Sequence, residues 1–128
     1  MTILRAGLRA ERLFTVTEAD TAIVLGSGDV AVLGTPRLLA WAEAATIAAL
    51  DGALGSGETS VGARVELDHM AASPVGARVS ARAELVVVEG RALVFDVDLF
   101  HDDGAMVGRG RVSRVVVSRD RFLARSRD

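Results

Sequence analysis

The sequence predicts an α+β fold in which one long antiparallel sheet wraps around a single buried helix. Residues 34–50, GTPRLLAWAEAATIAAL, are the one substantial helical segment, and they are apolar nearly all round, which is typical of a helix inside a protein. From residue 61 onward, apolar and polar residues alternate with a period of two, as in half-buried antiparallel strands. These strands are long, up to about ten residues against a mean of about five to six, and only one helix is available to cover them.

The predicted helix carries both start and stop signals. Thr35 is a preferred N-cap residue, Pro36 fits the first turn, and a glycine follows the last turn. Leucine and alanine fill the interior, in which Glu43 is the only charged side chain. A buried carboxylate is costly unless it is paired. Glu43 therefore needs a partner arginine from a strand, such as Arg64 or Arg109, or a catalytic role.

The remaining elements are expected to be strands. A first strand covers residues 8–17, and the later strands cover residues 61–69, 78–87, 91–101 and 108–118 and follow one another as a meander, with a solvated tail after them. Hairpin turns are expected at residues 89–90 and 103–104. The residues assigned to the buried face are Val61, Ala63, Val65, Leu67, His69, Val79, Ala81, Ala83, Leu85, Val87, Leu93, Phe95, Val97 and Leu99. Because such a sheet exposes its edges, we expect a homodimer, or a higher assembly, with the sheets continued across an edge.

The composition sets limits on the class of protein. The 128 residues are expected to form one domain, residues 1–128. A net charge of −2 argues against nucleic-acid binding. The absence of cysteine excludes thiol nucleophiles and disulfides, and no metal site is expected. The sequence has neither a signal peptide nor an apolar run long enough to span a membrane, so the expected location is the cytoplasm.

Four residues reproduce a family pattern by type and spacing. Glu43 follows Thr35 by eight residues, His69 follows Gly62 by seven, and His69 follows Glu43 by 26. With the segments GSGDVAVLGTPRLLAWAE and DHMAASPVG, these spacings resemble the fluoroacetyl-CoA thioesterase group of the hot-dog superfamily over nearly the whole chain. The founding member of that group has an aromatic lid before the helix. Residues 29–34, DVAVLG, contain no aromatic residue, and selectivity for fluoroacetate stays open.

The resemblance implies hydrolysis of a small acyl-CoA thioester by Thr35, Glu43 and His69, with no cofactor because CoA is part of the substrate. Glu43 can attack the thioester, activate water or orient His69 across the helix. Thr35 can cap the helix, polarise the thioester, or do both. His69 is otherwise a core histidine, with His101 as a surface residue.

Binding of the acyl group adds further candidates. Gly62 either lets the backbone approach the acyl group or is an ordinary strand glycine. Its parity is opposite to that of His69, which requires a bulge if both face the helix. Because Pro36 has no N–H, a backbone donor for the oxyanion from this helix has to come from Arg37 or Leu38.

The phosphates of CoA would be held by arginines such as Arg78, Arg109, Arg111 and those of residues 118–128, unless these form a solvated face. Two other functions fit the same fold: a module that binds an acyl-CoA without turnover, and, more weakly, an enoyl-thioester hydratase.

Overall fold

The computed structural model describes residues 2–126. In chain order its elements are β1 (Arg9–Thr15), the 3₁₀ turn η1 (Glu18–Asp20), α1 (Ala22–Leu25), α2 (Thr35–Ala49), β2 (Glu58–His69), β3 (Arg78–Glu89), β4 (Ala92–His101), β5 (Met106–Ser118) and α3 (Arg119–Arg125). Within these residues, no helix has both the length and the apolar character needed to cross a membrane.

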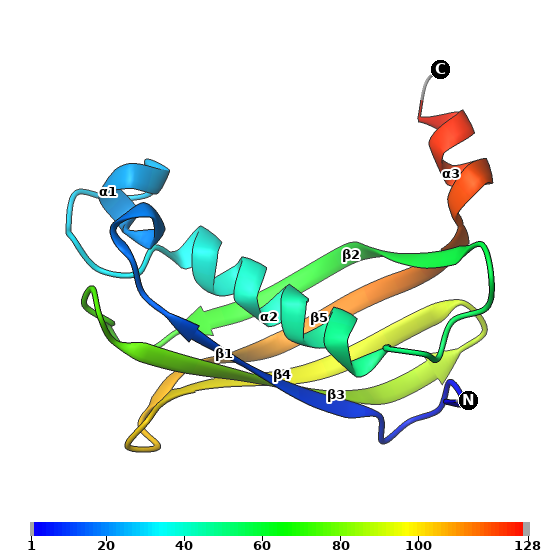
Figure 1. The fold of residues 1–128 in the computed structure, drawn as a ribbon, viewed down its shortest axis with the longest axis horizontal. Coiled ribbons are helices and arrows are strands. Elements are labelled where there is room, and N and C mark those ends of the chain that lie inside the picture. The colour runs from blue at the N-terminus through cyan, green and yellow to red at the C-terminus, as the bar shows by residue number, and fades with distance from the viewer. Residues whose placement is uncertain (1, 127–128) are drawn as a thin grey trace.

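The five strands form one antiparallel sheet in the order β1-β3-β4-β5-β2, and α2 lies against its concave face (Figure 1). The predicted architecture of a long sheet around one helix is therefore confirmed. The predicted meander is correct for β3, β4 and β5, which are joined by the two expected hairpins. It is wrong for β2, which pairs with β5 at the sheet edge rather than with β3.

The core lies between α2 and the inward face of the sheet. Leu38, Ala42 and Ala45 of α2 are fully buried, and Trp41 stacks on Phe14 of β1 with ring centroids 4.7 Å apart. Burying a leucine side chain stabilises a fold by about 1.5–3 kcal/mol. The small alanines allow α2 to approach the strands closely. The strand residues buried beneath it include Val79, Ala81, Ala83, Leu85, Leu93, Phe95, Val97 and Leu99, as predicted.

Two β-bulges change which side chains face the core. In β2 the register shifts between Gly62 and Arg64, so Ala63 has no partner on β5. An extra residue reverses the alternation. Val61 and Ala63 therefore do not share the face of His69, and that prediction was wrong. A second bulge in β3 likewise makes Val88 rather than the predicted Val87 the next residue packed against the core.

The segments at the two ends of the sheet depart from the expectations. The first strand stops at Thr15, and residues 18–25 form the short helical turns η1 and α1 instead. The tail is exposed over residues 119–126, as expected, but it also forms a helix, α3, whose start is capped by the Ser118 hydroxyl, which accepts a hydrogen bond from the Arg121 N–H. Figure 1 shows α3 extending away from the sheet beyond the end of β5.

Candidate active site

Thr35 was predicted to be the N-cap of α2, but it lies within the first turn of the helix. Gly34 is the N-cap, and Thr35 is the first helical residue. A Cβ at Gly34 would lie 3.0 Å from Leu25 Cδ1 and 3.1 Å from Ala22 Cα, so a glycine suits this tightly packed position. The Thr35 hydroxyl instead lies 2.7 Å from His69 Nδ1, across from α2 to the end of β2.

The predicted backbone donors after Pro36 are already engaged. The N–H groups of Arg37 and Leu38 donate to the Gly34 carbonyl at 3.0 and 3.1 Å. Arg37 Nε lies 2.9 Å from Asp20 Oδ1, an ion pair in which the N–H does not point at the oxygen. The backbone N–H of Thr35, at the first helical position, has no acceptor among residues 2–126. The donors available at this helix start are therefore those of Thr35 itself.

His69 is half-buried at the inward face of β2. Its Nε2 is buried and has no hydrogen-bond partner within residues 2–126. Burial lowers the pKa of His69 below the ordinary 6.5, and the nearby Ala71 backbone opposes this in part without reaching hydrogen-bond geometry with the ring. The imidazole is therefore mostly neutral near pH 7 and can accept a proton.

Glu43 is paired with an arginine that the sequence reasoning missed. Its Oε2 lies 3.1 Å from Arg114 Nη1, while Arg114 also donates to Ser60 Oγ at 2.9 Å and to the Ser60 carbonyl at 3.1 Å. Arg114 is 5% exposed, whereas the Glu43 side chain is 32% exposed. Burial lowers the pKa of the guanidinium, and the charge and hydrogen bond of Glu43 oppose that shift.

The partners proposed earlier for Glu43 were wrong, because Arg64 pairs with Glu66 and Arg109 with Asp98. Arg114 could have been found from the strand pattern. It alternates with Val112 and Val116, both of which are buried, and therefore shares their inward face.

Gly62 makes room for the Glu43 carboxylate. A Cβ built at Gly62 would overlap Glu43 Oε2, so only a glycine allows the carboxylate to lie against this strand. The bulge at Ala63 turns Gly62 inward despite its unfavourable spacing from His69. Neither of the two expectations for Gly62 describes this contact, which is with a side chain of α2.

The candidate residues thus form two separate groups. One is the Thr35–His69 pair, and the other is Glu43 with Gly62 and Arg114. Eight residues of helix separate Thr35 from Glu43 by about 12 Å along the axis. On β5, six residues separate the positions opposite Gly62 and His69, which is roughly 20 Å. His69 therefore does not bridge to Glu43 within one chain.

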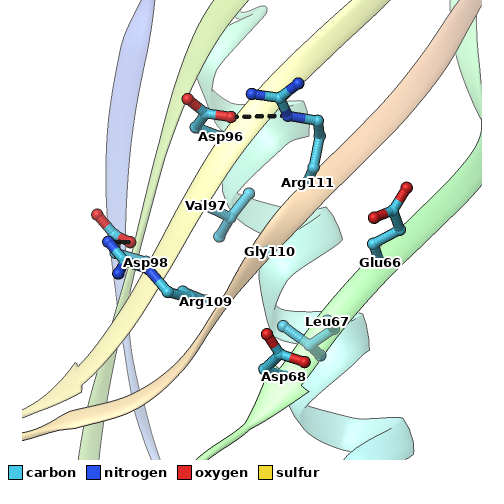
Figure 2. Close-up of a pocket in the computed structure, with 9 residues that line it drawn as sticks. All are labelled: Glu66, Leu67, Asp68, Asp96, Val97, Asp98, Arg109, Gly110 and Arg111. Carbon is cyan, nitrogen blue, oxygen red and sulfur yellow. Dashed lines mark hydrogen bonds and ion pairs between the residues drawn. The ribbon is translucent and has the colours of Figure 1, made fainter.

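A groove of about 520 Å³ lies elsewhere, on the outer face of the sheet (Figure 2). Arg109 and Arg111 lie there in ion pairs with Asp98 and Asp96 at 3.7 and 3.1 Å, and α2 is behind the sheet. Arg78 pairs with Asp102 at 3.1 Å. These three arginines form ion pairs on the charged outer surface of the protein.

Two further observations concern histidine and metal binding. His101 was expected at the surface, yet it is half-buried, with Nε2 2.7 Å from the hydroxyl of the buried Ser73. Among residues 2–126, no group of three or more His, Asp or Glu side chains is arranged to hold a metal ion.

Comparison with known proteins identifies the family. Residues 16–120 match the family model described as fluoroacetyl-CoA-specific thioesterase. The fluoroacetyl-CoA thioesterase of Streptantibioticus cattleyicolor is 35% identical over 96 residues, 75% of this chain and 68% of that protein. The crystal structure of a point mutant of the fluoroacetyl-CoA-specific thioesterase FlK has a TM-score of 0.90 at 31% identity, covering 99% of this chain and 98% of the other. A thioesterase superfamily member from Thermus thermophilus has a TM-score of 0.90 at 25% identity, covering 99% and 93%. The chain therefore belongs to the fluoroacetyl-CoA thioesterase family of the hot-dog thioesterase superfamily.

Proposed function

We propose that this chain hydrolyses a small acyl-CoA thioester to the free acid and CoA, with Thr35, Glu43 and His69 at the reacting centre. The Thr35–His69 pair carries the proposal: a hydroxyl 2.7 Å from a half-buried imidazole whose other nitrogen is buried and unpartnered. The family supports the substrate class. Structures of FlK, about a third identical to this chain, are described in complex with fluoroacetate and with acetyl-CoA.

The residues divide the chemistry as follows. The hydroxyl and the free N–H of Thr35 polarise the thioester carbonyl and hold the developing oxyanion at the start of α2. If Glu43 acts as a base, it takes a proton from the attacking water, the C–S bond breaks as the tetrahedral intermediate collapses, and the proton held by Glu43 passes through His69 to the departing thiolate. If Glu43 attacks the carbonyl itself, the C–S bond breaks as the anhydride forms and the thiolate leaves. His69 then takes a proton from the water that opens the anhydride and gives it to the thiolate. A single turnover in ¹⁸O-water tests the anhydride route, because opening of the anhydride at the Glu43 carbonyl leaves label in that carboxylate, whereas the general-base route never labels it.

We infer that the two groups of site residues come from different protomers. β2 is a 12-residue strand at the free edge of the sheet, and such an edge is available to pair with a second copy. In an antiparallel pairing, the two copies of β2 run in opposite directions across the dimer axis. The Gly62 end of one β2 therefore approaches the His69 end of the other, which is the juxtaposition that a single chain lacks.

A particular register follows from the bulge and the charges. If the twofold axis passes beside Glu66, the two copies of Glu66 face each other. Arg64, which pairs with Glu66 of its own chain at 2.9 Å, then also lies opposite Asp68 of the partner subunit, so the two arginines offset the charge of these carboxylates. Because Ala63 is bulged out, the next inward residue, Gly62, then lies opposite the partner's His69. Residues directly opposite in such a ladder have Cα atoms about 5 Å apart. The Glu43 carboxylate, which lies against Gly62, would then share one pocket with that imidazole.

A mixing experiment tests both the reaction and the dimer. Glu43→Ala and His69→Ala proteins are each expected to be inactive in a thiol-release assay. After unfolding and refolding together, half of the dimers are mixed, and each mixed dimer has one intact site. About a quarter of the wild-type rate should therefore return. A site built from one chain would recover nothing.

The substrate panel covers acetyl-, fluoroacetyl-, propionyl- and butyryl-CoA. The comparison of fluoroacetyl- with acetyl-CoA matters most, because residues 29–34 contain no aromatic side chain. Saturable binding with intact thioester would instead indicate a non-catalytic module, and addition of water to an enoyl-CoA would indicate a hydratase. Exchange of charge between Arg64 and Asp68 checks the register: Arg64→Asp should weaken the dimer in sedimentation, and Arg64→Asp with Asp68→Arg should restore it.

A further inference from the structure

Ser73 joins three segments of the chain near the start of α2. It is fully buried, and its Oγ lies 2.7 Å from Nε2 of His101 at the end of β4. Its carbonyl accepts a hydrogen bond from the N–H of Leu33 at 2.8 Å. The neighbouring residues Val32 and Pro74 form an isolated antiparallel bridge at the same place. None of these contacts has a part in the hydrolysis described above.

The position of this junction relates it to the Thr35–His69 pair. Ser73 follows His69 by four residues, and Leu33 precedes Thr35 by two. The segments that carry the two reacting side chains therefore meet at Ser73, and His101 fastens their meeting point to the sheet.

Without the Ser73–His101 hydrogen bond, the segment after His69 would be attached to the sheet more firmly than the segment before Thr35. The segment after His69 has its own attachment to β5, because the N–H groups of Met70 and Ala71 donate to the Val107 carbonyl at 2.7 and 3.3 Å. The segment before Thr35 is otherwise held by α1 and its neighbours, through Ala22 N–H to Val32 O at 2.8 Å. Its hydrogen bonds to the segment after β2 run through the Ser73 junction, while the buried Leu33 side chain packs in the core.

We propose that Ser73 and His101 are positioning residues that hold the Thr35 hydroxyl within reach of His69. The inference rests on the proposed function, since it assigns this pair a part in the same reaction. If the Ser73–His101 bond is lost, the segment that carries Thr35 can move relative to β2, and the 2.7 Å contact lengthens. A displacement of about 1 Å at a reacting group can lower the rate by about 100-fold. Substrate binding is affected less, because neither residue reaches the reacting centre.

Two substitutions at His101 separate positioning from general stability. Glutamine places an amide nitrogen near the position of Nε2, so His101→Gln can keep a hydrogen bond to Ser73. His101→Leu fills similar space without any polar group. We expect His101→Leu to lower kcat by about 10- to 100-fold with KM within about twofold, Ser73→Ala to behave alike, and His101→Gln to retain most of kcat. A KM effect alone, or equal losses in the leucine and glutamine variants, would overturn the proposal.

An NMR titration gives a readout that does not depend on turnover. The chain has two histidines, so each His101 variant leaves His69 as the only imidazole. Within residues 2–126, burial and the Ala71 backbone set the pKa of His69, with no contribution from a charged side chain. Loosening of the junction admits water and should move that pKa up toward 6.5 in His101→Leu, while His101→Gln keeps the depressed value. The same pKa in both folded variants would refute the positioning role, whereas absence of thioesterase activity in every variant would refute only the proposed function.

Discussion

Substitution of Gly62 by alanine tests the contact between β2 and the Glu43 carboxylate. The added Cβ would overlap Glu43 Oε2, and an ordinary contact begins at 3.4 Å. The carboxylate therefore has to retreat by about 1 Å, which loosens its hydrogen bond to Arg114 and moves it from the position from which it acts. A misplacement of this size corresponds to a loss of about 100-fold in kcat.

The same substitution should leave stability almost unchanged. The displaced atom is the tip of a flexible side chain that is about one third exposed, so it can shift toward solvent while Arg114 keeps its two hydrogen bonds to Ser60. Replacing a strand glycine by alanine gains about 0.5–1 kcal/mol, and the weakened hydrogen bond costs about 1 kcal/mol. These terms nearly cancel, so Tm should stay within about 4 °C of the parent value.

The assay is a double-mutant cycle in single-turnover thioester hydrolysis with excess enzyme, accompanied by thermal unfolding of each variant. In a Glu43→Asp background the shorter carboxylate no longer reaches Gly62, so Gly62→Ala should not lower the residual single-turnover rate further. Two results would refute the reasoning: full activity of Gly62→Ala in the wild-type background, or an equal additional loss in the Glu43→Asp background. A fall in Tm of more than 10 °C would also show that the Cβ meets backbone rather than a movable carboxylate.

Three further outcomes follow from the site. Thr35→Val should lower kcat by about 10- to 100-fold in a thiol-release assay. Because Gly34 holds the capping position, the free energy of unfolding measured by chemical denaturation should change by less than the roughly 0.5–2 kcal/mol of a lost cap. The pKa of His69 is depressed when folded, so the unfolded chain binds more protons below pH 6.5. The contribution of His69 to stability should therefore be complete above pH 6.5 and be lost as pH falls through the folded pKa, a dependence that His69→Gln removes in urea titrations. Arg114→Leu abolishes three hydrogen bonds and should leave Glu43 misplaced, with kcat reduced while far-UV circular dichroism is retained; unchanged kcat would show that Glu43 needs no such support.

The sequence predicted the parts of the fold that depend on regular periodicity. The helix composition located α2 to within a residue at each end, and the alternation in residues 91–101 assigned Leu93, Phe95 and Leu99 correctly to the core. Neither bulge could be located from alternation alone, because a bulge is a local interruption of the pattern on which the method relies. The place of β2 beside β5 depends on long-range pairing, about which spacing within a strand says nothing.

In the candidate site, too, the sequence predicted the residues but not their arrangement in space. Residue types and spacings selected Thr35, Glu43 and His69, and the structure gives each of Thr35 and Glu43 a polar partner. The separation of the three into two groups was not foreseen, because an ideal helix indicates distance along α2 but not which strand residues lie beneath it. Arg114 was missed because its strand was read as a whole rather than face by face. Thr35 is not the cap because the helix begins at Thr35 itself, with Gly34 as its N-cap.

The unpaired Ala63 divides β2 into two half-strands of opposite phase. Before Ala63, the inward positions of β2 lie against Glu43 and Arg114. After Ala63, they lie against the core and Thr35. A deletion of this one residue would leave both halves chemically intact while exchanging inside for outside in one of them. The extra residue therefore changes which positions of β2 face inward. It allows one continuous strand to supply two sets of contacts that an unbroken alternation would hold on opposite faces.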